Sequence, residues 1–123
     1  MSMVGKKTVV IGASPNPERF SFKAVRKLQQ YHHLVIAVGI RDGSIDDIQI
    51  QKGFPAVQDT HTVTLYIGPP RQPDYYSYIL SLKPRRIIFN PGTYNDELTD
   101  LAEKNGINVM EACTLVLLAT GNY

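Results

Sequence analysis

The chain has 123 residues, a length typical of one domain, with a hydrophobic fraction of 43% and a charged fraction of 20%. This composition is typical of a globular protein and excludes a disordered or fibrous chain. No apolar run approaches the roughly 18 residues that a membrane helix needs, and the first seven residues lack the apolar core of a signal peptide. A single cysteine excludes an internal disulfide framework. We therefore expect one cytoplasmic domain over residues 1–123, with no membrane association.

Basic residues are concentrated in the first third of the chain. Residues 1–41 contain seven Lys or Arg residues against one acid, Glu18, although the net charge of the whole chain is only +2. Positive charge on one side of a protein favours an anionic ligand. We expect no nucleic-acid partner, because the sequence has no dense run of Lys and Arg and no aromatic residues interleaved with them.

Five short apolar runs are predicted to form strands, at residues 7–11, 34–38, 62–67, 86–89 and 107–110. A further short edge strand is a candidate at 48–51. Apolar residues at helical spacing follow most of these strands. The expected helix boundaries are a cap at Ser21, a first residue at Pro73, a cap at Asn95, a left-handed stop at Gly106 and a cap at Thr114.

Strands that alternate with helices predict a doubly wound, Rossmann-like α/β domain with a five-stranded parallel sheet. Right-handed crossovers then bring every strand-to-helix loop to one end of the sheet, where ligands bind in this architecture. These loops begin at Gly12, Gly39, Gly68, Asn90 and Glu111.

The loop between Gly12 and Ser21 is the strongest candidate for a binding site. Gly12 allows a tight turn out of the strand, while the backbone amides, the Ser14 hydroxyl and the positive end of the next helix suit a phosphate group. Arg19 and Lys23 are expected to add direct charge contacts. An ordinary strand–helix turn stiffened by prolines is the alternative. Neither GxGxxG nor GK[ST] is present, so the loop is neither the usual dinucleotide fingerprint nor a P-loop.

The loop after the second strand bears on which nucleotide is bound. An NAD site places an acid at this position to hold the ribose hydroxyls. Here the strand is followed by Gly39, Ile40 and Arg41. Arg41 is suited to a ribose phosphate, as in NADP or coenzyme A, and a solvated surface arginine is the alternative.

The third and fourth loops give weaker indications. Gly68 and Pro69 would let a flat ligand approach the end of the third strand, and Asn90, Pro91 and Gly92 form a similar loop after the fourth. Plain turns explain both segments equally well.

The sequence shows no convincing catalytic or metal-binding set. Cys113 precedes a predicted helix, whose N-terminus can acidify a thiol, but nearby Glu111 opposes this effect, and a buried apolar filler is the favoured alternative. The histidines lack the spacing of metal ligands. We therefore expect no metal and no catalytic residue. Three tyrosines on the helix after Pro73 suit packing or a subunit contact, which makes a homo-oligomer an expectation.

The segment Val10–Ser21 (VIGASPNPERFS) resembles the GAS-x-NP-x-R-x-S pattern of the small stand-alone CoA-binding domain proteins. Their fold is shared by the N-terminal domain of the succinyl-CoA synthetase alpha subunit. Residues 52–57 and 112–114 are also similar to the family, and the resemblance covers nearly the whole chain. It implies that phosphate is held chiefly by Gly12, Ala13, Ser14 and Arg19, with a secondary contribution from Ser21 and Lys23.

The chain departs from this family in three loops. It has Val38-Gly39-Ile40 where the family has Val-Asn-Pro, and Ile67-Gly68-Pro69 where the family has Phe-Arg. Its fourth loop, residues 89–92, replaces a Trp-x-Gln-x-Gly segment. The first two loops would border the adenosine half of a ligand, so these departures bear on nucleotide specificity.

The resulting hypothesis is non-catalytic binding of coenzyme A or an acyl-CoA. The diphosphate would lie on the loop between Gly12 and Ser21, the adenine between the second and third loops, and the pantetheine toward residues 90–92 and Cys113. One alternative is an NAD(P)-binding enzyme or redox sensor of related fold. Another is a scaffold that has lost its ligand and works through a partner.

Overall fold

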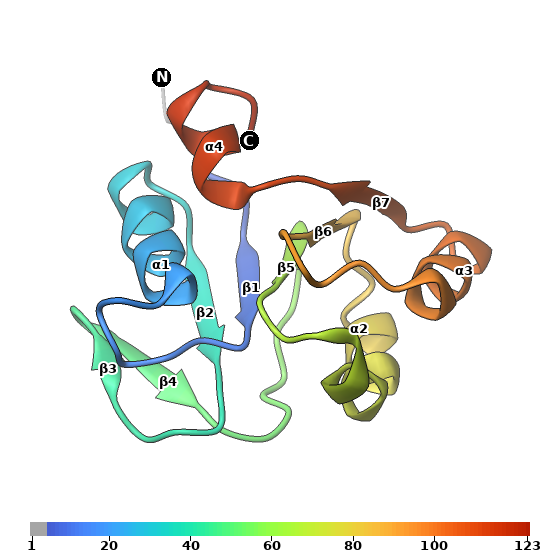
Figure 1. The fold of residues 1–123 in the computed structure, drawn as a ribbon, viewed down its shortest axis with the longest axis horizontal. Helices are drawn as coiled ribbons and strands as arrows, with labels where there is room; N and C mark the ends of the chain where they lie inside the picture. The colour runs from blue at the N-terminus through green and yellow to red at the C-terminus, as the bar shows by residue number, and fades with distance from the viewer. Residues whose placement is uncertain (1–4) are drawn as a thin grey trace.

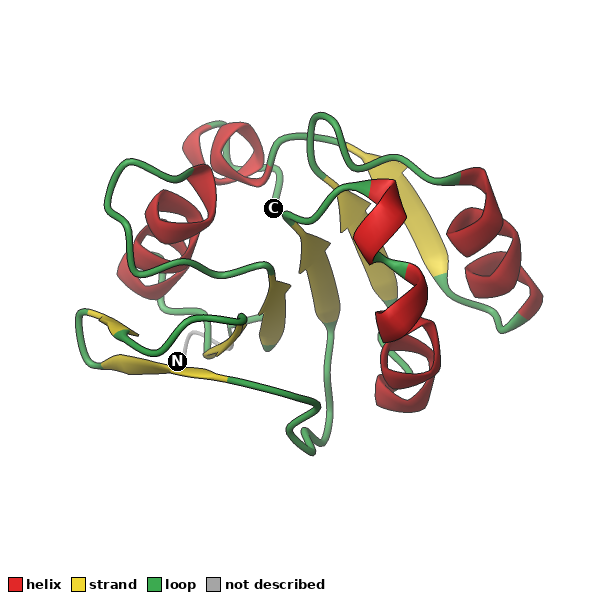
Figure 2. Cartoon of the chain, turned by 60° about the horizontal axis from the view of Figure 1, so that its bottom comes forward, coloured by secondary structure: helices red, strands yellow, loops and turns green. Residues whose placement is uncertain are grey.

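The structure is a computed structural model that describes residues 5–123, in which seven strands form one sheet between two layers of helices (Figure 1). Residues 1–4 lie outside the described residues. The expectation that the first seven residues are not a signal peptide therefore falls partly on residues that the structure does not describe. Helices α1 and α4 cover one face of the sheet and α2 and α3 cover the other, as Figure 2 also shows. The predicted Rossmann-like α/β fold is confirmed.

The sheet has the strand order β3-β4-β2-β1-β5-β6-β7. All described strands run parallel except β3, which is antiparallel to β4. Their bounds are Thr8–Ile11 (β1), Val35–Val38 (β2), Ser44–Ile45 (β3), Ile48–Gln51 (β4), Thr62–Leu65 (β5), Arg86–Phe89 (β6) and Asn108–Glu111 (β7).

The prediction of five strands is wrong in its count, because a hairpin of β3 and β4 extends the sheet beyond β2. The candidate strand at 48–51 is confirmed as β4, whose exposed glutamines alternate with more buried isoleucines. Strand β3 has only two residues and is followed by Asp46 with a φ of 52°. So short a strand leaves no hydrophobic pattern in the sequence.

Two of the predicted helix caps are displaced. Helix α1 covers Phe20–Gln30 and its N-cap is Arg19, so Ser21 lies buried within the first turn. Helix α4 covers Thr114–Ala119 and its N-cap is Cys113. The Thr114 hydroxyl lies 2.8 Å from the hydroxyl of Thr64 on β5, which explains its burial at the start of the helix.

The middle helices begin near the expected residues. Pro73 opens a 3₁₀ turn that leads into α2 (Tyr76–Leu82), while Asn95 caps α3 (Asp96–Lys104) by accepting hydrogen bonds from the Glu97 and Leu98 amides. Gly106, with a φ of 73°, follows α3 as predicted.

The tyrosines of α2 are engaged within the chain. The Tyr78 hydroxyl donates to the Pro55 carbonyl at 2.7 Å, and the Tyr76 hydroxyl accepts from the Asn95 side chain at 2.8 Å. Both hydroxyl groups therefore have partners within the chain and need no second subunit. The expected homo-oligomer stays a prediction.

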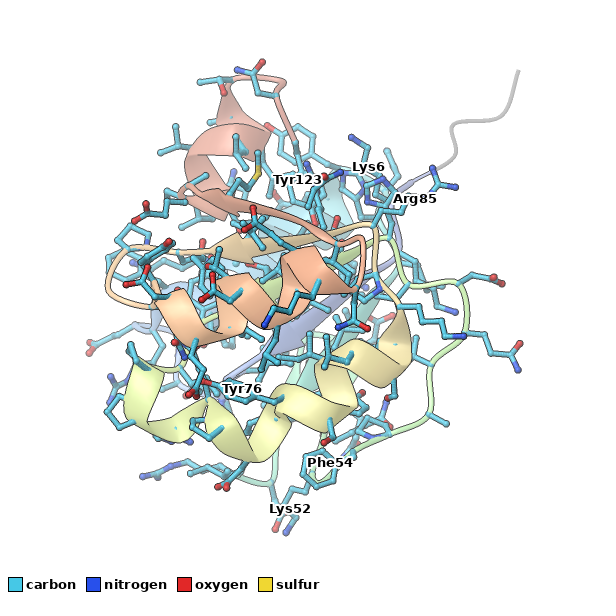
Figure 3. All side chains as sticks on the ribbon, turned by 90° about the vertical axis from the view of Figure 1, so that its right-hand side faces the viewer. Lys6, Lys52, Phe54, Tyr76, Arg85 and Tyr123 are labelled. Carbon is cyan, nitrogen blue, oxygen red and sulfur yellow. The ribbon has the colours of Figure 1, made fainter. Side chains whose placement is uncertain are left out.

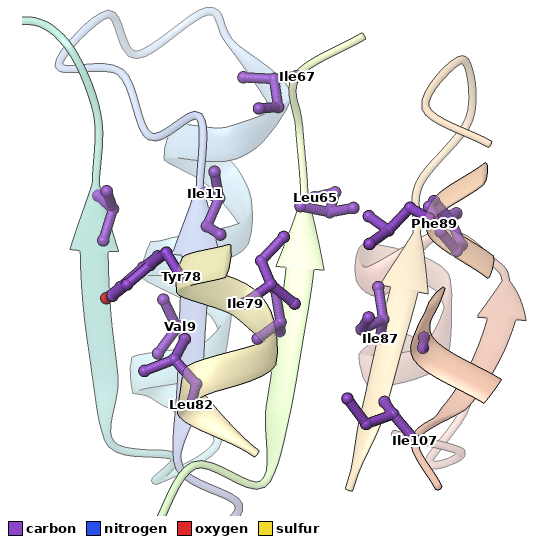
Figure 4. Close-up of a cluster of buried hydrophobic side chains, with 14 residues drawn as sticks. Val9, Ile11, Leu65, Ile67, Tyr78, Ile79, Leu82, Ile87, Phe89 and Ile107 are labelled. Atoms are coloured by element: carbon purple, nitrogen blue, oxygen red, sulfur yellow. The ribbon is translucent and has the colours of Figure 1, made fainter. Parts of the chain in front are cut away.

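The core lies on both faces of the central strands. Val9, Ile11, Leu65 and Phe89 pack against α2 and α3, as Figure 4 shows. Val10, between two of these residues in the sequence, points to the opposite face, where α1 and α4 lie. This burial on both faces explains the continuous apolar run of β1.

The fold brings the expected loops to one edge. The last residues of the parallel strands align across the sheet, since Ile11 pairs with Val38 and Leu65, and Leu65 pairs with Phe89. The segments after β1, β2, β5 and β6 therefore leave the sheet together. Among residues 5–123, no helix is long and apolar enough to cross a membrane.

Candidate functional site

Hydrogen bonds to β2 fix the start of the loop after β1. The amides of Gly12 and Ala13 both donate to the Val38 carbonyl, each at 2.9 Å. Gly12 has a φ of 97°, and a Cβ atom there would lie 2.8 Å from Cγ2 of Ile67. Only glycine fits this turn without strain. Since the first two loop amides already bond within the sheet, the predicted amide contacts to an anion are confined to residues further along the loop.

The N-terminus of α1 has amides without partners. Its N-cap, Arg19, has extended backbone angles but makes no capping hydrogen bond through its side chain. The amides of Phe20, Ser21 and Phe22 have no acceptor among residues 5–123. Such a helix end is partly positive and suited to a phosphate oxygen.

A cavity of about 380 Å³ lies at this helix end, and we call it the carboxyl-edge cavity. This volume is within the usual range of about 300–1,000 Å³ for small-molecule sites. The residues that line it come from the loops after β1, β2, β5 and β6 and from the first turn of α1: Gly12, Ala13, Ser14, Arg19, Phe20, Ser21, Ile40, Arg41, Tyr66, Ile67, Arg71, Pro91 and Thr93.

The lining of the carboxyl-edge cavity is positively charged. It includes Arg19, Arg41 and Arg71 and no carboxylate. Within the described part of the chain, the ion pairs are Arg26–Asp46 and Lys52–Asp42, so these three arginines have no acidic partner there. Guanidinium groups bind phosphate through charge-assisted, often bidentate hydrogen bonds.

Hydroxyl groups complement the arginines. Ser14 and Ser21 line the cavity, and Ser14 Oγ accepts a hydrogen bond from the Asn16 amide at 3.1 Å, which orients it within the loop. The combination of helix amides, hydroxyls and guanidinium groups therefore fits a phosphorylated ligand. No cluster of three or more His, Cys, Asp or Glu side chains suited to a metal occurs among residues 5–123.

A model of the CoA-binding domain family matches residues 6–119. The chain belongs to the CoA-binding domain family. A crystal structure of an uncharacterized protein is 42% identical, has a TM-score of 0.95, and the match covers 98% of this chain and 100% of that one. No significant match was found among curated proteins.

Two more distant structures share the fold alone. A hypothetical protein from Pyrococcus horikoshii OT3 is 21% identical with a TM-score of 0.82, and the match covers 91% of this chain and 80% of that one. A conserved hypothetical protein from Pyrococcus furiosus is 18% identical with a TM-score of 0.78, covering 90% and 97%.

In this CoA-binding domain, the carboxyl-edge cavity brings together half of the residues predicted from the sequence. Those that line it are Gly12, Ala13, Ser14, Arg19, Ser21, Arg41 and Pro91. The remaining predicted residues lie outside its lining: Lys23, Gly39, Gly68, Pro69, Asn90, Gly92 and Cys113.

Two of these outlying residues have structural roles of their own. Gly39 passes so close to the first loop that a Cβ atom would collide with the carbonyl oxygen of Ala13. The buried Asn90 side chain donates to the Thr64 hydroxyl at 2.6 Å and the Leu65 carbonyl at 2.8 Å, and accepts from the Thr114 amide at 2.9 Å. It therefore joins β5, β6 and α4.

Two others are displaced from the cavity. Lys23 lies one turn along α1, with its ammonium group 5.4 Å from the centre of the Phe20 ring. Cys113 is the half-buried N-cap of α4, so it is neither the fully buried filler favoured above nor part of the cavity lining.

Several residues of the cavity were not predicted from the sequence. Arg71 ends the 3₁₀ turn Pro69–Arg71, which brings it to the cavity, although only Gly68 and Pro69 of this segment were predicted to border a ligand. Phe20 and Ile40 line the cavity although they are 67% and 65% exposed. Large apolar side chains next to the loop that is predicted to bind phosphate were a signal in the sequence that a flat organic group could bind there.

Proposed function

We propose that this CoA-binding domain binds coenzyme A or an acyl-CoA in the carboxyl-edge cavity, as a binding module without catalysis of its own. The observation that carries this proposal is the convergence of three arginines without acidic partners on the uncapped end of α1. Coenzyme A has a diphosphate and a ribose phosphate, which require this concentration of positive charge.

The parts of the ligand can be assigned to different sides of the cavity. The diphosphate lies against the amides at the start of α1, with Arg19 beside it. Arg41 and Arg71, from the loops after β2 and β5, are the candidates for the ribose phosphate, and exposed Ile40 offers an apolar surface to the adenine. The pantetheine leaves past Pro91 and Thr93 rather than toward Cys113, which does not line the cavity.

Calorimetric titration with coenzyme A tests the proposal. Charge reversal in Arg19→Glu should weaken binding by about 1.5–3 kcal/mol, the scale of hydrogen bonds to charged groups, which is a factor of about 10–150. Lys104→Glu makes the same change in net charge at an exposed position on α3 and should leave the affinity unchanged.

The choice of ligand separates the alternatives. Parallel titrations with dephospho-CoA, NAD and NADP are the comparison, because Arg41 would also suit the ribose phosphate of NADP. Binding of coenzyme A that is lost with dephospho-CoA supports the proposal and the role of the ribose phosphate. Binding of a nicotinamide dinucleotide alone, or an unchanged affinity of Arg19→Glu for coenzyme A, would contradict it.

A further inference from the structure

A second concave site lies at the opposite edge of the sheet, where the parallel strands begin. Its volume is about 980 Å³, and we call it the amino-edge hollow. It is formed by the segments before β1 and β5 and by the connection from α2 to β6. Its lining residues are Gly5, Lys6, Lys7, Val57, Gln58, Asp59, Thr60, His61, Ser81, Leu82, Lys83 and Arg85.

The lining of the amino-edge hollow has an excess of positive charge. The basic side chains are Lys6, Lys7, Lys83 and Arg85, joined by His61, and the lining has one acid, Asp59. Among residues 5–123, none of these basic groups is ion-paired with an Asp or Glu side chain. Figure 3 shows Lys6 and Arg85 near each other at this edge of the molecule.

The basic side chains differ in how they are engaged. Lys6 donates to the main-chain oxygen of Tyr123, and Lys7 donates to the Gln58 carbonyl at 2.6 Å. Lys83 and Arg85 are exposed and make no side-chain hydrogen bond with the described part of the chain. Lys83 and Arg85 are therefore wholly free to bind a ligand, and Lys6 and Lys7 each use one of the three N–H donors of their ammonium groups in these bonds.

A further positive charge lies behind the hollow. The Arg86 guanidinium stacks on the Tyr123 ring at 4.5 Å and donates through Nε to the Thr62 hydroxyl at 2.8 Å. Its Nη2 atom is buried without a partner in the described structure. Burial and then the charges of Arg86, Lys6, Arg85 and His33 lower the pKa of His61, which indicates a positive potential at this edge.

A polar group in the wall also lacks a partner. Thr60 is 5% exposed and lines the hollow, and its hydroxyl forms no hydrogen bond with residues 5–123. Buried polar groups are normally satisfied, so this hydroxyl is a hydrogen-bond donor that the wall of the hollow leaves unused.

We propose that the amino-edge hollow is a second anion site, which binds a small soluble molecule with two or more phosphate groups. One phosphate contacts Lys83 and Arg85, while the size of the hollow and the additional bases before β1 and β5 accommodate another. This site is independent of the coenzyme A proposal, since the sheet separates it from the carboxyl-edge cavity and the two linings have no residue in common.

The test uses the ¹⁵N-labelled full chain, titrated with pyrophosphate at constant ionic strength and followed by amide chemical shifts. We expect saturable shifts at His61, Lys83 and Arg85. The double variant Lys83→Gln/Arg85→Gln should weaken this binding at least about tenfold, since two charge-assisted contacts are lost. The matched double variant Arg19→Gln/Lys23→Gln removes the same charge at the other edge and should leave these shifts unchanged.

The possible outcomes distinguish this site from the coenzyme A site. Saturable shifts at the amino edge that depend on Lys83 and Arg85 support the second site, whether or not coenzyme A binds. Pyrophosphate shifts confined to the start of α1 would overturn it. So would equal shifts with sodium chloride at the same ionic strength, or an unchanged affinity in the Lys83/Arg85 double variant whose spectrum is that of a folded protein.

Discussion

Gly39 illustrates a residue whose identity is fixed by a backbone contact. Its amide donates to the Gln51 carbonyl at 3.0 Å, which joins β2 to β4, and its Cα faces the Ala13 carbonyl without room for a side chain. The sequence predicted this glycine as the first residue of a loop at the ligand-binding edge and gave no sign of the backbone contact. Close approach of the first and second loops is sufficient to explain it.

The Gly39→Ala variant should therefore be less stable, because the added methyl group forces the first loop away from β2. Overpacking of this kind costs about 1–3 kcal/mol in the free energy of unfolding, measured by urea denaturation. Gly68→Ala is the matched control. A Cβ atom at Gly68 would lie 3.7 Å from Pro70 Cδ, an ordinary contact, and its φ of −71° suits any residue. Equal stability of the two variants would show that the loops are not in tight contact.

Asn90 shows the limit of sequence reasoning at the scale of a residue. An asparagine before Pro-Gly is typical of a turn, and the same residue type can also bind a ligand. Its partners Thr64, Leu65 and Thr114 lie 24 to 26 positions away in the chain. Only the register of β5 against β6 brings them together, so the sequence could predict the turn but not the buried hydrogen-bond network.

At the scale of an element, the start of α1 is suited to ligand binding at some expense of helix stability. Arg19 occupies the N-cap position, where Ser, Thr, Asp and Asn are preferred because their side chains accept hydrogen bonds from the free amides. An arginine leaves those amides unpaired while adding a positive charge beside them. This combination stabilises a bound anion, but it leaves the helix less stable on its own than a capping residue would.

Comparison of Arg19→Ser with Arg19→Ala separates the two effects. Both variants lose the guanidinium group and should bind coenzyme A more weakly. The serine variant should be more stable than the alanine variant by about 1 kcal/mol in urea denaturation, the usual contribution of an N-cap. At Lys23, inside the same helix, the order should reverse because alanine has the higher helix propensity. An alanine variant at least as stable as the serine variant at position 19 would contradict the uncapped helix end.

The predicted elements were most accurate where hydrophobic burial is strongest. Strand β1 and its neighbours are buried on both faces, so their apolar runs marked them in the sequence. The hairpin of β3 and β4 has two residues in one strand and alternating exposure in the other, which is a weak pattern. The cap of α1 was misplaced because a serine within reach of the helix start was preferred to an arginine.

For the whole molecule, the structure divides what was one basic region in the sequence. Lys6 and Lys7 precede β1, whereas Arg19 follows it, so four residues of strand separate these charges onto opposite edges of the sheet. The C-terminal half then contributes Arg71 to one edge and Lys83 and Arg85 to the other. Charge counting predicted an anionic ligand, but only the direction of β1 and the crossover connections show that there are two separate positive surfaces.

This charge distribution predicts how stability depends on pH. Burial, followed by repulsion from Lys6 and Arg86, lowers the pKa of His33, and burial with Arg86 as the largest repulsive charge lowers the pKa of His61. The unfolded chain, with histidine pKa values near 6.5, therefore binds more protons than the folded chain in this range. Stability is complete above about pH 6.5 and should fall as the pH drops through that value toward the lower folded pKa values.

Urea denaturation gives the free energy of unfolding at about pH 7.5 and at about pH 5.5, and we expect the lower value at the lower pH. The difference between these two free energies should be much smaller in the His33→Gln/His61→Gln variant. About 0.5 M salt should reduce the difference without abolishing it, because salt screens the repulsion from Lys6 and Arg86 but leaves the cost of burial. The lowered pKa of Asp46 does not contribute to this difference in stability, because a carboxylate with a pKa below its ordinary 3.8 stays ionised at both pH values. A wild-type protein that gains stability on acidification over this interval would show that the amino edge is not electropositive in solution.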